Sequence, residues 1–282
     1  MIEGFKNFLR VNGASEATIK SYALKIEEYI RWYKGSFDLE FRRLYRENAT
    51  DYLAYLRTIK RDSAKTINTK VSALISLNQF LINLGVQNDF VVDKKDRIKV
   101  QEQIISPTKV NKADVEQFRQ RLLEEEGSRY YCIATIGMFC GLRIFEILSI
   151  QLSDFNFTTR ELIVNRGKGN KIRIVYMNEK VVNSIKEYLK ERKSDSTYLF
   201  PSEKSATGKM HPSAVNKVFN KYSKIITPHQ LRHYCATSMI TSDTARFAIH
   251  EAAAILGHSS VQTTLRYCNI SKNELLDKID RL

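Results

Sequence analysis

Cysteine is scarce in this chain of 282 residues, and none of its four cysteines stands in a CxxC pair. The four are Cys132, Cys140, Cys235 and Cys268. Their neighbours have a helical pattern, which is typical of buried, reduced thiols and argues against a disulfide framework. The sequence also lacks an HExxH motif and a cluster of carboxylates, so we expect neither a metal ion nor another cofactor.

Long apolar runs are missing as well. No segment approaches the 18 or so apolar residues that a membrane span requires, and no apolar run follows a basic start as in a signal peptide. The hydrophobic fraction of 43% is enough for packed cores, and the charged fraction of 27% is ordinary for a soluble protein. We therefore expect a cytoplasmic protein with one large domain or two of ordinary size.

Basic charge, by contrast, is abundant. The formal net charge is +14, of which residues 1–106 carry +5 and the remainder +9. Because both halves are basic, the charge is not a tail, and a polyanion that contacts both halves is favoured over a polybasic anchor. A merely basic soluble protein is the plainer alternative on charge alone.

The first part of the chain has apolar residues at three- and four-residue steps in four segments, which predicts a compact four-helix bundle. Ser15 is the expected cap of the second helix, and the third helix is expected to follow Asn48. The fourth is expected to start near Ser63. These segments define a first domain over residues 1–92.

The pattern changes between residues 93 and 107. A run of charges at residues 93–97 precedes a stretch that is expected to be extended, since Pro107 disfavours helix at the residue before it. We interpret residues 93–107 as an interdomain linker, and Asn111 is the expected cap of the next helix.

A second domain, residues 108–270, is predicted to be mainly helical with one β-hairpin. Strands are expected at residues 161–165 and 171–177, around the glycine-bearing turn of residues 166–170. Helices are expected at residues 179–191, 212–224, 229–240, 246–256 and 260–267. The predicted fold class is therefore mainly α, with a four-helix domain followed by an α+β domain that holds a small hairpin.

Four clusters of the second domain combine glycine with arginine, lysine or histidine. They are Gly141-Leu142-Arg143, Gly167-Lys168-Gly169-Asn170-Lys171, His229-Gln230-Leu231-Arg232-His233 and Leu256-Gly257-His258, the last of which lies nine residues before Tyr267. Each cluster alone has a plain structural explanation, such as a packing glycine, a β-turn, a capping histidine or a helix C-cap. Their order and spacing together are much more specific.

The combined pattern Arg…Lys…His-x-x-Arg…His…Tyr resembles the catalytic domain of the tyrosine recombinase, or phage integrase, family. The matching residues are Arg143, Lys168, His229, Arg232, His258 and Tyr267. The resemblance continues between the motifs, through Glu146, Leu148, Asp154, Leu199-Phe200-Pro201 and Thr263-Thr264. The N-terminal bundle is similar to the family's SAM-like core-binding domain in size, position and helix count. The compact two-domain size is most similar to that of Xer recombinases, including the archaeal single-protein form.

This resemblance implies a site-specific recombinase that cleaves and rejoins DNA through a 3′-phosphotyrosyl intermediate on Tyr267. Arg143 and Arg232 would offer paired donors to the non-bridging phosphate oxygens, where charge develops in the transition state. One phosphodiester is exchanged for another, so ATP is not required.

Proton transfer would involve the remaining matched residues. A tyrosine phenol has an ordinary pKa of about 10 and needs help to ionise, for which His229 is the expected base. His258 is expected to donate to a phosphate oxygen, and Lys168 is the general acid that the resemblance implies for the leaving 5′-oxygen. His233 and Lys171 lie beside the motif and are competing candidates.

The partner that the resemblance implies is double-stranded DNA with inverted half-sites. A homotetramer would hold two duplexes, whereas the free protein would be a monomer or dimer, located in the cytoplasm at the nucleoid. Residues 271–282 form a tail whose apolar stripe predicts a short helix. That helix either packs on its own domain or, as is common in the family, docks on a neighbouring protomer.

Several functions stay open at this point. The recombinase would resolve chromosome dimers for chromosome partition and cell division, as Xer proteins do, or would integrate a mobile element. A DNA-binding architectural protein without strand exchange is the alternative of another class, while type IB topoisomerases and telomere resolvases use similar chemistry. The presence of all six matched residues favours an enzyme over a pure binder.

Overall fold

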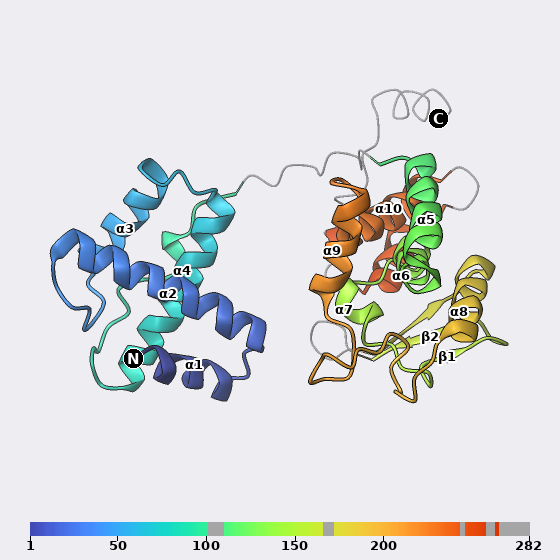
Figure 1. Cartoon of the computed structure of the whole chain (residues 1–282). Helices are drawn as coiled ribbons and strands as arrows, with labels where there is room; N and C mark the ends of the chain where they lie inside the picture. The colour runs from blue at the N-terminus through green and yellow to red at the C-terminus, as the bar shows by residue number, and fades with distance from the viewer. Residues whose placement is uncertain (101–109, 166–171, 243–245, 258–262, 265–282) are drawn as a thin grey trace, which may run out of the picture. The chain divides into compact units, whose positions relative to one another are not determined.

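The computed structural model describes residues 1–100, 110–165, 172–242, 246–257 and 263–264 of a chain that divides into two compact units, Met1–Glu102 and Gln103–Leu282 (Figure 1). The first unit is helical, and the second combines helices with a small antiparallel sheet. The predicted fold class is thereby confirmed. Among the described residues, no helix is both long and apolar enough to cross a membrane.

The first unit contains the four predicted helices, α1 (Ile2–Val11), α2 (Glu16–Phe37), α3 (Arg46–Thr58) and α4 (Ala64–Asn83). The side chain of Ser15 caps α2 as predicted. Helix α4 starts directly after Ser63, as predicted, and the Ser63 side chain is its cap. Helix α3 begins earlier than predicted from Asn48, because its first turn is closed by the backbone bond from Ala49 N–H to the Tyr45 carbonyl (3.0 Å).

The start of the expected linker is attached to the first unit. A short 3-10 helix, η1 (Lys94–Asp96), is held by the two-pronged contact of Arg46 with the Asp96 carboxylate, at 2.7 and 2.6 Å. The Asn68 side-chain amide donates to the Ile98 carbonyl and accepts from the Ile98 N–H, each at 2.8 Å. The first unit therefore extends beyond residue 93, where the linker was expected to begin, and includes Ile98.

The second unit is built around α6, which is buried on nearly all sides. The helices that the structure describes in it are α5 (Lys112–Glu126), α6 (Ser128–Cys140), α7 (Ile144–Ile147), α8 (Glu179–Glu191), α9 (Pro212–Tyr222), α10 (Pro228–Thr241) and α11 (Ile249–Leu256). Helices α5, α8 and α10 pack against α6 (Figure 1). The predicted cap Asn111 accepts a hydrogen bond from Asp114 N–H at 2.8 Å.

The sheet has the order β1 (Phe155–Asn156), β2 (Glu161–Val164) and β3 (Arg173–Tyr176), with antiparallel pairing throughout. Strands β2 and β3 are the predicted hairpin, whereas β1 was not predicted, since two residues give no periodicity. In β2 and β3, Leu162 lies opposite Val175 and Val164 opposite Arg173. Leu162, Val164 and Val175 are buried, so Arg173 shares the inward face of the sheet.

Three of the four cysteines are described, and all three are buried free thiols, as predicted. Burial raises the pKa of the Cys132 and Cys235 thiols to about 12 in each case, so both stay protonated and unreactive at neutral pH. Cys268, the hairpin turn, most of the predicted helix 260–267 and the tail 271–282 lie outside the described residues.

Candidate active site

The loop that carries Arg143 leaves the central helix through Gly141, where a side chain would clash. Gly141 ends α6 in the left-handed region, with φ of 61°. A Cβ at this position would lie 2.6 Å from Leu256 Cδ2 and 3.1 Å from Cys235 Sγ. The glycine thus allows the end of α6 to lie directly against α10 and α11.

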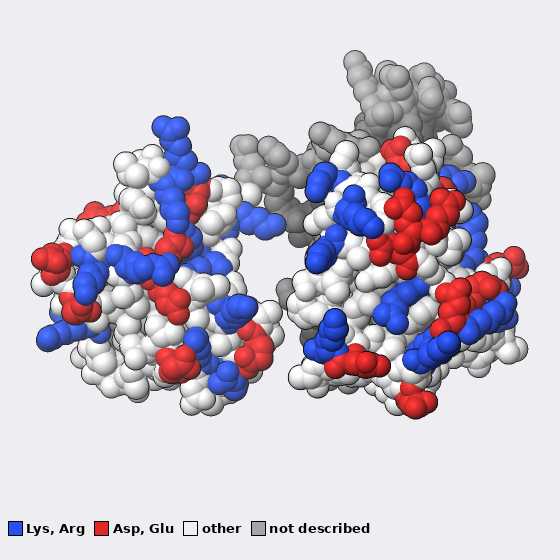
Figure 2. Space-filling model, viewed as in Figure 1, with Lys and Arg blue, Asp and Glu red and all other residues white. Residues whose placement is uncertain are grey.

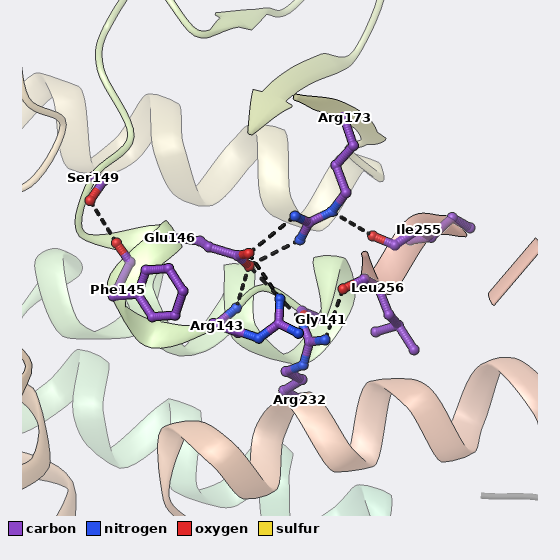
Figure 3. Close-up of polar contacts among 9 residues, drawn as sticks. All are labelled: Gly141, Arg143, Phe145, Glu146, Ser149, Arg173, Arg232, Ile255 and Leu256. Atoms are coloured by element: carbon purple, nitrogen blue, oxygen red, sulfur yellow. Dashed lines mark hydrogen bonds and ion pairs between the residues drawn. The ribbon is translucent and has the colours of Figure 1, made fainter. Parts of the chain in front are cut away.

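Glu146, in the short helix α7, is the centre of the site. Its side chain is 0% exposed. One carboxylate oxygen accepts from the Arg143 backbone N–H at 2.8 Å, and the other accepts from Arg143 Nη1 at 3.1 Å. Arg173 donates to both oxygens through its Nη1 and Nη2 atoms, at 3.1 and 2.9 Å (Figure 3).

The charge of Glu146 follows from these contacts. Burial acts to raise the pKa of its carboxyl, but the hydrogen bonds from Arg173 and from the Arg143 backbone outweigh burial, so the pKa lies below its ordinary value. Glu146 is therefore an ionised carboxylate at neutral pH, and it fixes both the backbone and the guanidinium of Arg143.

Arg232 enters the same cluster from α10. Its Nη1 donates to the Gly141 carbonyl at 2.6 Å, and its Nη2 donates to the Leu256 carbonyl at 2.8 Å (Figure 3). Both carbonyls belong to helix C-terminal ends, where a cation is favourable. The Nη1 atom also lies 3.9 Å from Glu146 Oε2. The structure therefore brings Arg143 and Arg232 together around one carboxylate.

His229 and His233 lie one turn apart on α10. Their Nε2 atoms are 2.7 Å apart, so one ring donates to the other. Burial, followed by the nearby charges of His229 and Arg232, lowers the pKa of His233 to about 4. His233 is therefore neutral at pH 7. The structure places the predicted base His229 at the exposed end of this pair and His233 at the more buried end.

The cluster is electropositive. Among the described residues, Arg143, Arg173 and Arg232 surround a single anionic group, Glu146. Arg143 is the most accessible of the three, with 27% of its side chain exposed against 5% for Arg232. Arginines held in fixed positions with an excess of positive charge can bind a phosphate group and stabilise further negative charge on it.

The six predicted catalytic residues divide into two groups. Arg143, His229 and Arg232 are described, and the structure joins the two arginines through Glu146 and carries His229 on the helix of Arg232. The other three, Lys168, His258 and Tyr267, lie outside the described residues. Within the part of the chain that is described, no group of three His, Cys, Asp or Glu side chains could hold a metal ion.

Arg173 is the site residue that the sequence analysis missed. It starts β3, and its Nε donates to the Ile255 carbonyl at 3.0 Å (Figure 3). The alternation along the strand indicates that Arg173 is buried, because Arg173 shares a face with the buried Val175 and not with the exposed Ile174. An arginine on the buried face of a strand requires an anionic or carbonyl partner.

The comparisons with known proteins agree with this geometry. Residues 109–274 match the model of the phage integrase family, and residues 1–84 match that of its N-terminal SAM-like domain. The chain is 44% identical to the TnP I resolvase of Bacillus thuringiensis over 283 residues, 99% of this chain and 98% of the relative. It is 27% identical to the tyrosine recombinase XerA of Pyrococcus horikoshii, over 100% of this chain and 93% of the relative.

A solved structure shares the fold over the full length. The Tn1549 transposon integrase, in complex with a circular intermediate DNA, is 19% identical and superposes with a TM-score of 0.70, covering 100% of this chain and 99% of that one. The family model alone spans more than half of the sequence and includes every residue of the arginine cluster. On this evidence, the chain belongs to the phage integrase family of tyrosine recombinases.

Proposed function

We propose that the protein is a site-specific DNA recombinase in which Tyr267 forms a 3′-phosphotyrosyl bond with the cleaved strand. The observation that carries the proposal is the pair Arg143 and Arg232, which both form ion pairs with Glu146 in an electropositive cluster. Such a cluster suits the pentavalent phosphoryl transition state, which gathers charge on its non-bridging oxygens. Membership of a family whose relatives are named recombinase and resolvase supports the same conclusion.

The proposed reaction balances without a cofactor. The Tyr267 oxygen attacks phosphorus, a Tyr–O–P bond forms, and the bond from phosphorus to the 5′-oxygen breaks. His229 takes the phenolic proton, while Lys168 gives a proton to the 5′-oxygen. His258 donates to a phosphate oxygen. Rejoining is the reverse attack by a 5′-hydroxyl, so the energy of the phosphodiester is conserved.

Double-stranded DNA is the proposed partner. Both units carry Lys and Arg side chains, interspersed with acidic ones on the face that Figure 2 shows. Several structures similar in fold are recombinases bound to DNA, such as XerH on its difH substrate. We propose inverted half-sites, each bound by one protomer, and a homotetramer on two duplexes, with the tail 271–282 docking between protomers.

Resolution is the biological role that the relatives favour. A protein named resolvase is 44% identical over 99% of this chain, whereas the XerA relatives are 27–29% identical. We therefore propose recombination between two copies of one site in the same DNA molecule, as part of a mobile element. Xer-type resolution of chromosome dimers is the second candidate, since XerA relatives also match over the full length.

Recombination of a plasmid tests this role. The DNA site is first recovered by binding selection with the full chain, and two copies are then cloned as direct repeats. Resolution predicts two smaller circles from one plasmid, formed faster than any product that joins two plasmids. A protein that joins separate plasmids but does not resolve the direct repeats contradicts the proposed role and favours integration.

A further inference from the structure

Arg173 joins three separate segments of the second unit, its own strand and two others. It belongs to β3, it donates two hydrogen bonds to Glu146 on α7, and its Nε donates to the Ile255 carbonyl near the end of α11. Its side chain is 12% exposed. The guanidinium thus uses all three nitrogens in directed contacts, and Figure 3 shows it between the carboxylate and α11.

On the side of Gly257, the Arg173 guanidinium leaves no room for a further side chain. Gly257 ends α11 in the left-handed region, with φ of 64°. A Cβ at Gly257 would lie 2.8 Å from Arg173 Cζ and Nη1. The glycine is therefore required for two reasons, the backbone conformation and the close approach of Arg173.

The three segments joined by Arg173 are those that lead to the proposed catalytic residues. Glu146 holds Arg143 directly. Gly257 immediately precedes His258 in the chain, and Arg173 follows Lys168 by five positions at the base of the hairpin. A fixed, planar, two-pronged contact at this junction restricts all three segments at once, which a flexible lysine could not do.

We propose that Arg173 is a positioning residue for DNA cleavage: it fixes Glu146, and through it Arg143, while fastening the C-terminal end of α11 to the hairpin. We assign Arg173 no contact with the reacting phosphate. The inference rests on the proposed function, because it assigns a role to Arg173 within that reaction.

The test compares Arg173→Lys with wild type on two DNA duplexes. Both carry the site recovered by binding selection, with the cleavage position mapped on wild-type protein. One has an ordinary phosphodiester there, and the other has a methylphosphonate, which lacks the negative charge that the arginines stabilise. Single-turnover cleavage is measured at saturating protein, and thermal unfolding verifies that each variant is folded.

Arg173→Lys should slow cleavage of the phosphodiester by about 10- to 100-fold, the range expected when a catalytic group is misplaced by a fraction of an ångström to an ångström. The methylphosphonate should be slowed much less, because its cleavage depends less on Arg143. Arg160→Lys is the matched control: Arg160 lies in the turn before β2, is 53% exposed and contacts Glu179 at 3.9 Å. Its cleavage rates should stay within about twofold of wild type.

A second pair of variants moves the Arg173 guanidinium without removing it. Gly257→Ala places a methyl group against Arg173, whereas Gly208→Ala has the same backbone strain, with φ of 70°, and no atom within 4 Å of its Cβ. Gly257→Ala should slow phosphodiester cleavage and Gly208→Ala should not. When Arg173 is already lysine, Gly257→Ala should slow phosphodiester cleavage little further, because both changes disturb the same contacts of the Arg173 guanidinium.

The outcomes separate this proposal from the proposed function. If wild-type protein forms no covalent adduct, the proposed function fails. If wild type cleaves but Arg173→Lys slows both duplexes equally, Arg173 serves stability alone and the positioning role is refuted. Cleavage by Arg173→Lys at the wild-type rate, or fully additive effects of the Arg173 and Gly257 variants, would also refute it.

Discussion

Replacement of Glu146 by glutamine should destabilise the second unit, even though the two side chains have nearly the same size. The carboxylate is fully buried and is the only anionic group in contact with Arg143 and Arg173 among the described residues. Glutamine removes the charge and turns an N–H₂ group toward guanidinium donors. Loss of one partner from a buried ion pair costs about 3–5 kcal/mol.

The lower end of that range applies here, since Arg143 is a quarter exposed and water can solvate part of its charge. A decrease of about 3 kcal/mol in the free energy of unfolding corresponds to a decrease in Tm of about 6–12 °C for a domain of this size. Differential scanning calorimetry of the full chain should show this decrease for the transition of the second unit.

The single tryptophan provides an internal control. Trp32 packs on Tyr29 and Tyr52 in the first unit, so its fluorescence reports the unfolding of that unit. The fluorescence transition should not move in Glu146→Gln. The variant Glu187→Gln is the matched control on the second unit, because Glu187 is 63% exposed and pairs with Lys190 on the surface. Its Tm should stay within about 2 °C of wild type.

The effect should also depend on pH. The pKa of Glu146 is lower in the folded protein than its ordinary value of 4.5. Ionised Glu146 therefore adds stability above the unfolded-state pKa, and this contribution is lost as the pH falls through the folded-state pKa. Since glutamine does not titrate, the difference between wild type and Glu146→Gln should narrow below about pH 4. Equal Tm values for the two proteins at pH 7 would refute the assignment of Glu146 as the counter-charge of the cluster.

Three further predictions concern protons and phosphates. Lys168→Ala should impair cleavage of an ordinary phosphodiester far more than of a 5′-bridging phosphorothiolate, whose leaving group needs no proton; equal impairment would make Lys168 a phosphate contact, and Lys171→Ala tests the competing lysine in parallel. Wild-type stability should decrease as the pH falls from about 6.5 to about 4, because His233 binds a proton in the unfolded chain but stays neutral in the folded one. The urea midpoint should therefore depend less on pH in His233→Asn over this range, and an unchanged dependence would contradict the lowered pKa of His233. DNA affinity should decrease steeply with salt, with a log–log slope of about −0.9 per phosphate contacted; a slope equivalent to one or two contacts would exclude binding by both basic units.

The sequence alone predicts much of this fold because periodicity and caps are local signals. Ser15 and Asn111 cap helices as predicted, and α4 starts after Ser63 as predicted. A side chain that accepts from a nearby backbone N–H needs no distant partner. Strand β1 was missed because two residues are ordered only by pairing with β2. The early start of α3 depends on a backbone bond rather than on a capping side chain, so Asn48 was misleading.

The site was predictable to a lesser degree. The motif residues Arg143, His229 and Arg232 are recognisable by their order and spacing in the sequence. The hydrogen bonds and ion pairs that hold them in place cannot be recognised in this way. Arg173 contacts Glu146 over 27 positions of sequence and Ile255 over 82, and no local pattern encodes such contacts. The position of Arg173 on the inward face of β3 could have indicated that this side chain is buried, but not which residues it contacts.

Tyr267 is the proposed nucleophile that joins the protein to DNA. Wild-type protein on a nicked duplex, from which the cleaved end diffuses away, should accumulate a denaturation-resistant adduct whose peptide map places the DNA on Tyr267. Tyr267→Phe should bind the same duplex with nearly unchanged affinity and form no adduct. Tyr222 is a useful comparison, because its hydroxyl already donates to Glu126 at 2.6 Å. Partial burial, followed by this hydrogen bond, raises the pKa of Tyr222. An adduct that persists in Tyr267→Phe and maps to Tyr222 or Tyr234 would refute the assignment of Tyr267 as the nucleophile.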